Sequence, residues 1–280
     1  MKEILPDWFN RKAPTGAEYE DTHTLVKKRN LNTVCESAKC PNIGECFAKK
    51  RATFLILGNT CTRNCGFCGI RHGEGEWLDP DEPKNIAKTI SNLYLKYIVV
   101  TSVTRDDLPD GGAGHFAKVV KEIRKVSSEI KIEVLTPDFK GDKNAIRAVL
   151  ESGPDVFSHN METVKSLYTK ARPEAGYIRS LELLKTIKDL NPGQVTKSGF
   201  MVGLGESEFE IDKLMADIVK TDCDILTIGQ YLRPSVENLP VHSYVKPEQF
   251  EKFKKQAERK GFKNVVSGPF VRSSYMADML

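Results

Sequence analysis

Six of the seven cysteines in this chain lie between residues 35 and 68. Thiols gathered in this way are typical of a metal-binding or redox site. Disulfides would be the expectation for a short secreted chain, whereas this chain has 280 residues and shows no sign of secretion. The sequence therefore predicts two metal centres from two triplets, which are Cys35, Cys40 and Cys46, and Cys61, Cys65 and Cys68.

The second triplet has the spacing C-x3-C-x2-C over Cys61, Cys65 and Cys68. Three thiolates this close can wrap one face of a 4Fe–4S cubane, which normally takes four ligands. One iron would then lack a cysteine and could be chelated by a small molecule that carries an amine and a carboxylate. Zinc is the alternative, but it takes four tetrahedral ligands, and His72 is the only nearby histidine that could complete the set.

The first triplet, with the spacing C-x4-C-x5-C over Cys35, Cys40 and Cys46, also lacks a fourth cysteine. The remaining cysteine, Cys223, lies beside a predicted strand in the context Thr-Asp-Cys-Asp. A lone cysteine in such a place is more typical of a small packing residue than of a ligand.

Composition and charge narrow the class of protein. The apolar fraction of 40% and the charged fraction of 29% are typical of a soluble globular protein. The net charge of +4 does not indicate a nucleic-acid partner, although it would favour an acidic protein partner. No stretch approaches the roughly 20 apolar residues of a membrane span. The segment Met1–Gly16 carries Glu3 and Asp7 and no apolar core, so we expect no targeting peptide and a cytoplasmic location.

Strand and helix signals alternate from residue 51 onwards, after an N-terminal stretch that reads as irregular. The predicted strands cover 52–58, 97–103, 131–135, 156–159, 195–202 and 224–231. The predicted helices cover 82–94, 114–127, 143–151, 178–190 and 208–220, and a further helix (247–260) and a short strand (264–267) follow. This alternation predicts an α/β protein with a parallel sheet and right-handed crossovers.

Polar or glycine-rich motifs follow several predicted strands, at Asn59-Thr60, Thr101–Asp107, His159-Asn160 and Gly203–Glu206. In β/α barrels the active site gathers at the carboxyl ends of the strands. The spread over many strands favours a partial (β/α)6 TIM-like barrel with N- and C-terminal extensions over an open doubly wound sheet. We expect three parts: an extension over 1–50 with the first triplet, the barrel over 51–245, and a helix and tail over 246–280.

The segment Cys61–Cys68, with Phe67 before the last cysteine, resembles the C-x3-C-x-aromatic-C signature of the radical S-adenosylmethionine (SAM) superfamily. Gly199–Glu206 fits that superfamily's G-x-I/M-x-G-x-x-E pattern. The resemblance implies that the open iron binds SAM, whose one-electron cleavage gives methionine and a 5′-deoxyadenosyl radical. Arg172 is a candidate partner of the SAM carboxylate. The SAM contacts that we expect are Phe67, Ser102, Asn160, Arg172, Met201, Gly203 and Glu206, although any of these polar residues could instead be solvated surface or capping positions.

The two triplets together resemble those of the lipoyl synthases, and further segments extend the resemblance over nearly the whole chain. These segments are Thr101–Gly112, His159–Val164, Thr227–Ser235 and Gly268–Ala277, the last of which carries an R-S-S-Y-x-A tail. The resemblance implies that a serine oxygen of this tail is the fourth ligand of the first triplet's cluster. We assign that ligand to Ser274, with Ser273 as the alternative, and expect Arg272 to anchor the tail or hold the substrate. An oxygen ligand matches a sulfur-bridged iron less well than a thiolate, so that iron should be released more easily.

The same resemblance implies two 4Fe–4S clusters and a reaction in which sulfur is inserted at C6 and C8 of an octanoyl chain on a carrier lysine. Two SAM molecules are used for each lipoyl group, and the first triplet's cluster supplies the sulfur. The implied partners are the glycine cleavage H protein or the lipoyl domains of 2-oxoacid dehydrogenases, and an electron donor such as flavodoxin or ferredoxin. Biotin synthases and methylthiotransferases lack this pairing of triplet and tail. A simple electron carrier would need neither a SAM pocket nor a substrate cavity.

Overall fold

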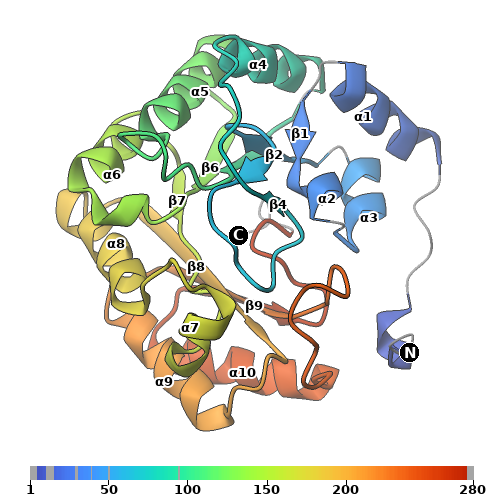
Figure 1. Cartoon of the computed structure of the whole chain (residues 1–280), viewed down its shortest axis with the longest axis vertical. Helices are drawn as coiled ribbons and strands as arrows, with labels where there is room; N and C mark the ends of the chain where they lie inside the picture. The colour runs from blue at the N-terminus through green and yellow to red at the C-terminus, as the bar shows by residue number, and fades with distance from the viewer. Residues whose placement is uncertain are drawn as a thin grey trace.

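The computed structural model describes residues 5–10, 16–28, 31–38, 40–49, 51–93 and 95–275. Its main sheet has the strand order β1-β2-β5-β6-β7-β8-β9-β10 and curves around a central space (Figure 1). Every neighbouring pair from β2 to β10 is parallel, and only β1 runs antiparallel to β2. The strands are β1 (Asn32–Thr33), β2 (Thr53–Ile56), β5 (Tyr97–Ser102), β6 (Lys131–Leu135), β7 (Val156–Ser158), β8 (Val195–Val202), β9 (Ile225–Gln230) and β10 (Asn264–Gly268).

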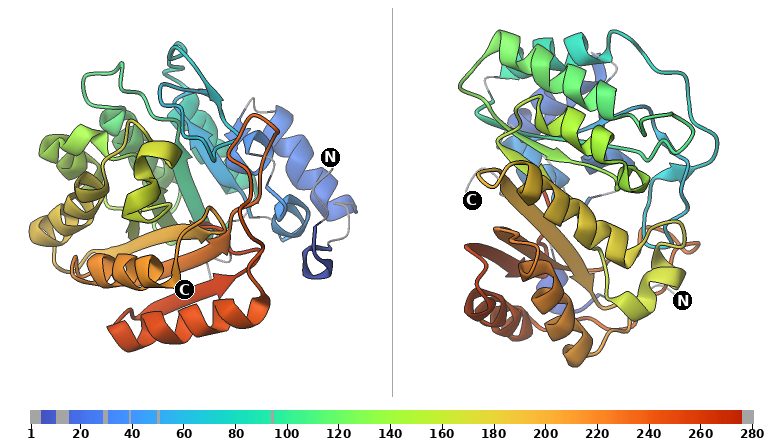
Figure 2. Two further views of the ribbon diagram at one scale, coloured as in Figure 1. Left: turned by 60° about the horizontal axis from the view of Figure 1, so that its bottom comes forward. Right: turned by 90° about the vertical axis from the view of Figure 1, so that its left-hand side faces the viewer.

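The long helices cover the outer face of the curved sheet (Figure 2). They are α4 (Glu82–Leu93), α5 (Ala113–Val126), α6 (Lys143–Leu150), α8 (Tyr177–Leu190), α9 (Glu208–Val219) and α10 (Pro247–Lys260). Each helix turns one apolar stripe to the sheet; α5, for example, buries Phe116, Val119, Val120 and Ile123. Parallel strands with helical crossovers confirm the α/β class, and β1 and β10 form separate edges, so the barrel is partial.

The strand alternation divides the side chains between two environments. Phe54, Ile56, Ile98 and Val100 belong to the core cluster that packs with the outer helices. Their neighbour Thr101 lines an inner cavity, and Leu55 belongs to both the core cluster and the cavity wall. The core therefore lies between the sheet and the helices, and the inside of the barrel is left for a ligand space.

A buried ion pair fills the inside of the barrel beneath that cavity. Lys197 Nζ on β8 lies 3.0 Å from Glu133 Oε2 on β6, and both side chains are 0% exposed. Tyr97 and Ser158 each donate a hydroxyl hydrogen bond to the Glu133 carboxylate, at 2.7 and 2.8 Å. A buried ion pair is tolerated only when its remaining lone pairs are satisfied, and this network supplies those partners.

The N-terminal region was predicted to be irregular, and this prediction was wrong. The described residues there form η1 (Asp7–Phe9), α1 (Ala17–Lys28), α2 (Val34–Ser37) and α3 (Ile43–Ala48). Two of these helices are too short for a helical period to show in the sequence. They are fixed by tertiary contacts instead, such as the stacking of Tyr19 on Phe47 at 5.8 Å.

Both extensions reach the main sheet. β1 from the N-terminal part pairs with β2, and β10 from the C-terminal part pairs with β9. Phe9 also packs edge-on against Phe270 at 5.3 Å. The predicted boundaries near residues 50 and 245 stay a prediction, because strands from all three parts share one sheet.

The remaining short elements lie in the connections that follow strands β2, β6 and β7. They are β3 (Thr60–Cys61), β4 (Arg71–His72), η2 (Phe139–Gly141), η3 (Lys165–Leu167) and α7 (Tyr168–Ala171). The predicted helix 82–94 ends at Leu93, and its last residue, Tyr94, lies outside the described residues, as do most of Met1–Gly16 and the last two residues of the R-S-S-Y-x-A tail. Within the described ranges, no helix is both long and apolar enough to cross a membrane.

Candidate active site

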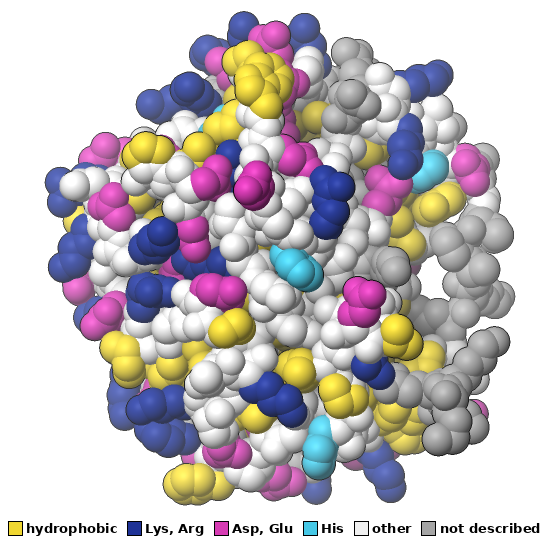
Figure 3. All heavy atoms as spheres, viewed as in Figure 1, with side chains coloured by type: hydrophobic (Ala, Val, Ile, Leu, Met, Phe, Trp, Pro, Cys, Tyr) yellow, Lys and Arg dark blue, Asp and Glu magenta, His cyan; other side chains and the backbone are white. Residues whose placement is uncertain are grey.

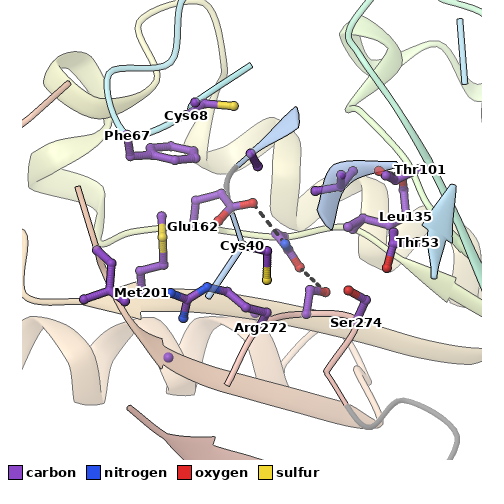
Figure 4. A pocket seen from close by; sticks show the side chains of 18 of the residues that line it. Cys40, Thr53, Phe67, Cys68, Thr101, Leu135, Glu162, Met201, Arg272 and Ser274 are labelled. Carbon is purple, nitrogen blue, oxygen red and sulfur yellow. Dashed lines mark hydrogen bonds between the residues drawn. The ribbon is translucent and has the colours of Figure 1, made fainter. Parts of the chain in front are cut away.

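A cavity of about 450 Å³ opens at the carboxyl ends of the strands. Its wall includes Cys35 and Cys40 from the first triplet, Cys68 from the second, and Ser274 from the C-terminal tail. Figure 4 shows Cys68 and Phe67 on one side of this space, Ser274 on another, and Cys40 between them. The structure thus brings both cysteine motifs and the tail, which are far apart in sequence, to one cavity.

Hydrogen bonds fix the loop of the second triplet. The backbone N–H groups of Thr104 and Arg63 lie 3.3 and 3.4 Å from Cys61 Sγ. Cys68 N–H donates to the Cys65 carbonyl at 3.0 Å, which closes a tight turn. N–H donors aimed at a sulfur stabilise a thiolate, and they also tune an iron–sulfur cluster that the thiolate holds.

Arg63, inside this loop, is clamped by two carboxylates. Its Nε lies 2.7 Å from Asp106 Oδ2 and its Nη2 lies 2.6 Å from Asp138 Oδ1. Burial alone would raise the pKa of Asp138, but the hydrogen bond and charge of Arg63 hold that pKa well below its usual range. Arg179 Nε pairs with the other Asp138 oxygen at 2.7 Å. The cysteine loop is therefore tied to the segment that follows β6.

The first triplet is arranged by α2, α3 and the turn between them. Cys40 N–H donates to the Cys35 carbonyl at 3.0 Å, and Cys46 N–H donates to the Asn42 carbonyl at 2.9 Å. The Thr33 hydroxyl caps α2 by accepting from the Glu36 N–H. These local bonds wind the chain so that Cys35 and Cys40 both reach the cavity wall.

The acidity of the thiols bears on whether they suit a metal. Burial raises the pKa of Cys35 and Cys68 to about 12 and that of Cys65 to about 11. Sulfurs of the same triplet add repulsion to these shifts: Cys40 and Cys46 act on Cys35, and Cys61 acts on Cys65. These thiols would lose their protons on binding a metal cation, because the positive charge offsets both the burial of the thiolates and the repulsion between them.

A single zinc ion fits this arrangement poorly. Among the residues with described coordinates, no three His, Cys, Asp or Glu side chains are placed around one metal ion. His72, the histidine that could have completed a zinc site, is exposed on β4. Cysteine thiols on one loop, with backbone N–H groups nearby, fit an iron–sulfur cluster, which is larger than a single zinc ion.

The C-terminal tail folds back against the first triplet. Asn42 Nδ2 donates to the Phe270 carbonyl at 2.7 Å, and Tyr275 Oη donates to Glu45 Oε2 at 3.1 Å. Arg272, Ser273 and Ser274 lie between these two anchors and line the cavity. The serines predicted to supply the fourth ligand therefore lie beside the first triplet, which lacks a fourth cysteine.

Four of the predicted SAM contacts lie on the cavity wall: Phe67, Ser102, Asn160 and Met201. Ser102 Oγ is buried and has no hydrogen-bond partner among the described residues. A buried hydroxyl without a partner costs free energy, and a bound ligand could remove that cost. Ser102 ends β5 and Asn160 follows β7, whereas Phe67 belongs to the cysteine loop and Met201 lies within β8.

The other three predicted contacts, Arg172, Gly203 and Glu206, are not among the residues that line the cavity. Glu206 accepts a hydrogen bond from the Leu204 N–H at 2.9 Å, and a Cβ on Gly203 would come within 2.5 Å of the Ser243 carbonyl oxygen. Both residues shape the turn after β8. Arg172 Nη1 donates to the Asn160 carbonyl at 3.0 Å, while its buried Nε has no partner in the described part of the chain. The SAM roles of these residues stay predictions.

Sequence reasoning missed Glu162, whose side chain enters the cavity (Figure 4). Burial raises the pKa of this carboxyl, and Asn160 Nδ2 donates to its Oε1 at 3.0 Å. Its φ of 66° places a non-glycine residue in the left-handed region, a strained conformation found at many functional sites. Two signals pointed to it: its position shortly after β7, and its place in the segment His159–Val164 that resembles the lipoyl synthases. Cys223 lies outside this site, buried, with its thiol directed to the Ile225 carbonyl at 3.5 Å.

Comparison with known proteins defines the class. The radical SAM superfamily profile matches residues 55–218. Streptococcus suis SuiB bound to S-adenosylmethionine aligns with a TM-score of 0.60 at 11% identity, over 80% of this chain and 54% of that one. Methylornithine synthase aligns with a TM-score of 0.57 at 15% identity, over 97% and 89% of the two chains. The fold is that of a radical SAM partial barrel, as the sequence predicted.

Closer relatives give the family. The lipoyl synthase of Caldanaerobacter subterraneus subsp. tengcongensis is 52% identical over 274 residues, covering 98% of this chain and 96% of that protein. The lipoyl synthase of Alkaliphilus metalliredigens is 52% identical over 272 residues, covering 97% and 94%. The chain belongs to the lipoyl synthase family. Membership confirms the predicted enzyme class, its function of making lipoyl groups on octanoylated proteins, and its use of two 4Fe–4S clusters and SAM.

Proposed function

We propose that the two cysteine triplets divide the work of a lipoyl synthase between them. Cys61, Cys65 and Cys68 hold the cluster whose open iron takes SAM. Cys35, Cys40 and Cys46, with Ser274 as the fourth ligand, hold the cluster that gives up its sulfur. The observation that carries this division is the single cavity lined by Cys35, Cys40, Cys68 and Ser274, because a radical and a sulfur source must reach the same substrate carbon.

Ser274 suits the ligand role better than its neighbour. Ser273 Oγ is engaged with Asn160 Oδ1 at 3.1 Å. Ser274 also lines the cavity, and its hydroxyl makes no hydrogen bond to the other described residues. An oxygen ligand from this side chain would leave one iron less firmly held than thiolate ligands do.

When bound, the clusters and SAM supply the one-electron cleavage and the sulfide that this chemistry needs. The chain's own residues bind, orient and exclude water. Leu55 and Leu135 give the cavity an apolar wall for an alkyl chain, and Phe67 covers the side next to Cys68. The hydroxyl of Ser102 and the amide of Asn160 offer hydrogen bonds at the polar end.

We infer the finer partners from the reaction. The octanoyl groups would be carried by the glycine cleavage H protein or by lipoyl domains of 2-oxoacid dehydrogenases, and flavodoxin or ferredoxin would donate electrons. The face in Figure 3 intersperses Lys and Arg with Asp and Glu, and the chain has a net charge of +4. The positive net charge favours an acidic partner, and the mixed face is unlike the basic stripe of a nucleic-acid binder. Reduced thiols imply a reducing, cytoplasmic compartment.

A single-turnover assay tests the division of roles. Anaerobic protein should hold about eight irons. Incubation with an octanoylated lipoyl domain, SAM and reductant should give the lipoyl product, 5′-deoxyadenosine and the loss of one cluster's spectrum. Cys40→Ala should still form 5′-deoxyadenosine but insert no sulfur. Lipoyl formation by that variant would refute the first triplet as the sulfur source.

A further inference from the structure

Ser273 joins the C-terminal tail to the opposite side of the cavity. Its hydroxyl donates to Asn160 Oδ1 at 3.1 Å, across 113 positions of sequence. Asn160 follows β7 and lines the cavity with Glu162. Hydrogen bonds run from Glu162 through Asn160 to Ser273, and Figure 4 draws them as dashed lines that start at Glu162.

The amide of Asn160 is held in one orientation. Its Nδ2 donates to Glu162 Oε1 at 3.0 Å, and its backbone carbonyl accepts from Arg172 Nη1 at 3.0 Å. The NH₂ group therefore faces the Glu162 carboxyl, and the amide oxygen faces the Ser273 hydroxyl. The Ser273 hydroxyl is therefore the group that fixes the free end of this amide.

The tail on either side of Ser273 is anchored elsewhere. The Phe270 carbonyl accepts from Asn42 at 2.7 Å, and Tyr275 donates to Glu45 on α3 at 3.1 Å. These contacts reach the segment that carries the first triplet. The Ser273 hydrogen bond ties the tail to the strand ends beside the second triplet, and the charge of Arg272 in the same tail also acts on Glu162 there.

We propose that Ser273 is a positioning residue that couples SAM binding at Asn160 to the placement of Ser274. The inference rests on the proposed function, because it takes Ser274 as a cluster ligand and the Asn160 side of the cavity as the SAM side. A ligand that changes the hydrogen bonds of Asn160 also changes its hydrogen bond to Ser273. In turn, a displacement of the tail changes the position of the Asn160 amide. Such a coupling is reciprocal, so each site must affect the other by the same factor.

The size of the coupling follows from one neutral hydrogen bond, which changes an equilibrium by about two- to tenfold. In anaerobic holoenzyme, Ser273→Ala should weaken SAM binding within that range. Amide hydrogen exchange in residues 271–275 should speed up by a similar factor. Added SAM should slow this amide exchange in the wild type, and it should slow the exchange less in Ser273→Ala. More 5′-deoxyadenosine should form for each sulfur inserted, because the tail that carries Ser274 is no longer fixed in position relative to the SAM site.

Two comparison variants make the test decisive. Ser273→Thr keeps the hydroxyl and should restore SAM affinity, tail exchange and the ratio of 5′-deoxyadenosine to product. Ser274→Ala should instead weaken iron retention at one cluster. The proposal is overturned if Ser273→Ala matches the wild type in SAM affinity and tail exchange, or if it loses iron as Ser274→Ala does. If the wild type itself forms no lipoyl product, the proposed function fails. The amide exchange rates and SAM affinities of the variants still test whether the Ser273–Asn160 hydrogen bond couples the two sites.

Discussion

Arg63 and Asp138 form a buried ion pair, with Nη2 and Oδ1 2.6 Å apart, between the cysteine loop and the segment after β6. Asp138 is 0% exposed and Arg63 is 5% exposed. Arg63 stands between Cys61 and Cys65, so the position of those two ligands depends on a carboxylate 75 residues away. The loop that we assign to the radical cluster is therefore shaped by the barrel and not by its own sequence alone.

Replacing Arg63 by Gln should destabilise the protein by about 3 kcal/mol, because one partner of a buried ion pair is removed. Arg63→Lys keeps the charge but loses the planar fork that contacts both Asp106 and Asp138, so it should not restore the wild-type loop. Iron content after anaerobic reconstitution, together with chemical unfolding, measures the effect. Lys213→Gln, which removes an exposed ion pair with Asp217, is the control and should change stability by less than about 1 kcal/mol. Full iron retention in Arg63→Gln would contradict a positioning role.

The Lys197–Glu133 pair inside the barrel gives a second prediction. Lys197→Met leaves the Glu133 carboxylate buried without its counter-ion and should cost about 3–5 kcal/mol of unfolding free energy. The double variant Lys197→Met with Glu133→Leu removes both charges and should recover part of that loss, because the Tyr97 and Ser158 hydroxyls then lose their acceptor. Denaturant unfolding of the two single variants and the double variant closes the thermodynamic cycle. An additive double variant would mean that the two groups do not interact.

Gly199 gives a third prediction, because a side chain at this position would enter the candidate active site. An added Cβ would lie 2.2 Å from Thr227 Oγ1 and 3.3 Å from Asn160 Oδ1. Gly199→Ala should therefore shift Asn160, lower SAM affinity and cost about 1–3 kcal/mol of stability through overpacking. Gly193→Ala, on an exposed turn where the nearest atom would be 3.4 Å away, should leave SAM affinity unchanged. Equilibrium dialysis with SAM separates the two variants, and equal affinities would contradict this account.

Much of this architecture could be predicted because its signals are local. The strands 131–135 and 195–202 and the helix 247–260 were predicted with the bounds that the structure has. Both cysteine triplets are identified by spacing alone. The parallel sheet follows from the alternation of strands and helices, and strand ends then place Ser102 and Asn160 at the cavity.

The rest depends on contacts that no local pattern records. The bonds Asn42–Phe270 and Arg63–Asp138 join residues 228 and 75 positions apart. Glu162 lines the cavity with its backbone at a φ of 66°, a conformation that no local sequence pattern predicts. The short helices α2 and α3 form around the cysteines, where packing and caps decide the structure and propensity contributes little.

A final prediction concerns His159, which is buried next to the site. Burial and the nearby Arg172 charge lower the pKa of His159 to about 4, despite the opposing effect of Asp138. Its ring is held between the Thr136 carbonyl at 2.9 Å and the Ser180 hydroxyl at 3.0 Å, a pattern that suits the neutral tautomer with Nδ1–H as donor.

The sign of its effect on stability follows from linkage. The unfolded chain takes up a proton on this histidine below pH about 6.5, whereas the folded chain does so only near pH 4. Stability should be complete above pH 6.5 and fall as the pH drops towards 4, with a loss of about 1.4 kcal/mol between pH 7.5 and 5.5. His159→Gln should be less stable at pH 7.5 and should lack this loss. Anaerobic denaturant unfolding at the two pH values checks the prediction; an equal loss in both proteins would show that other groups, such as carboxylates, carry the pH dependence.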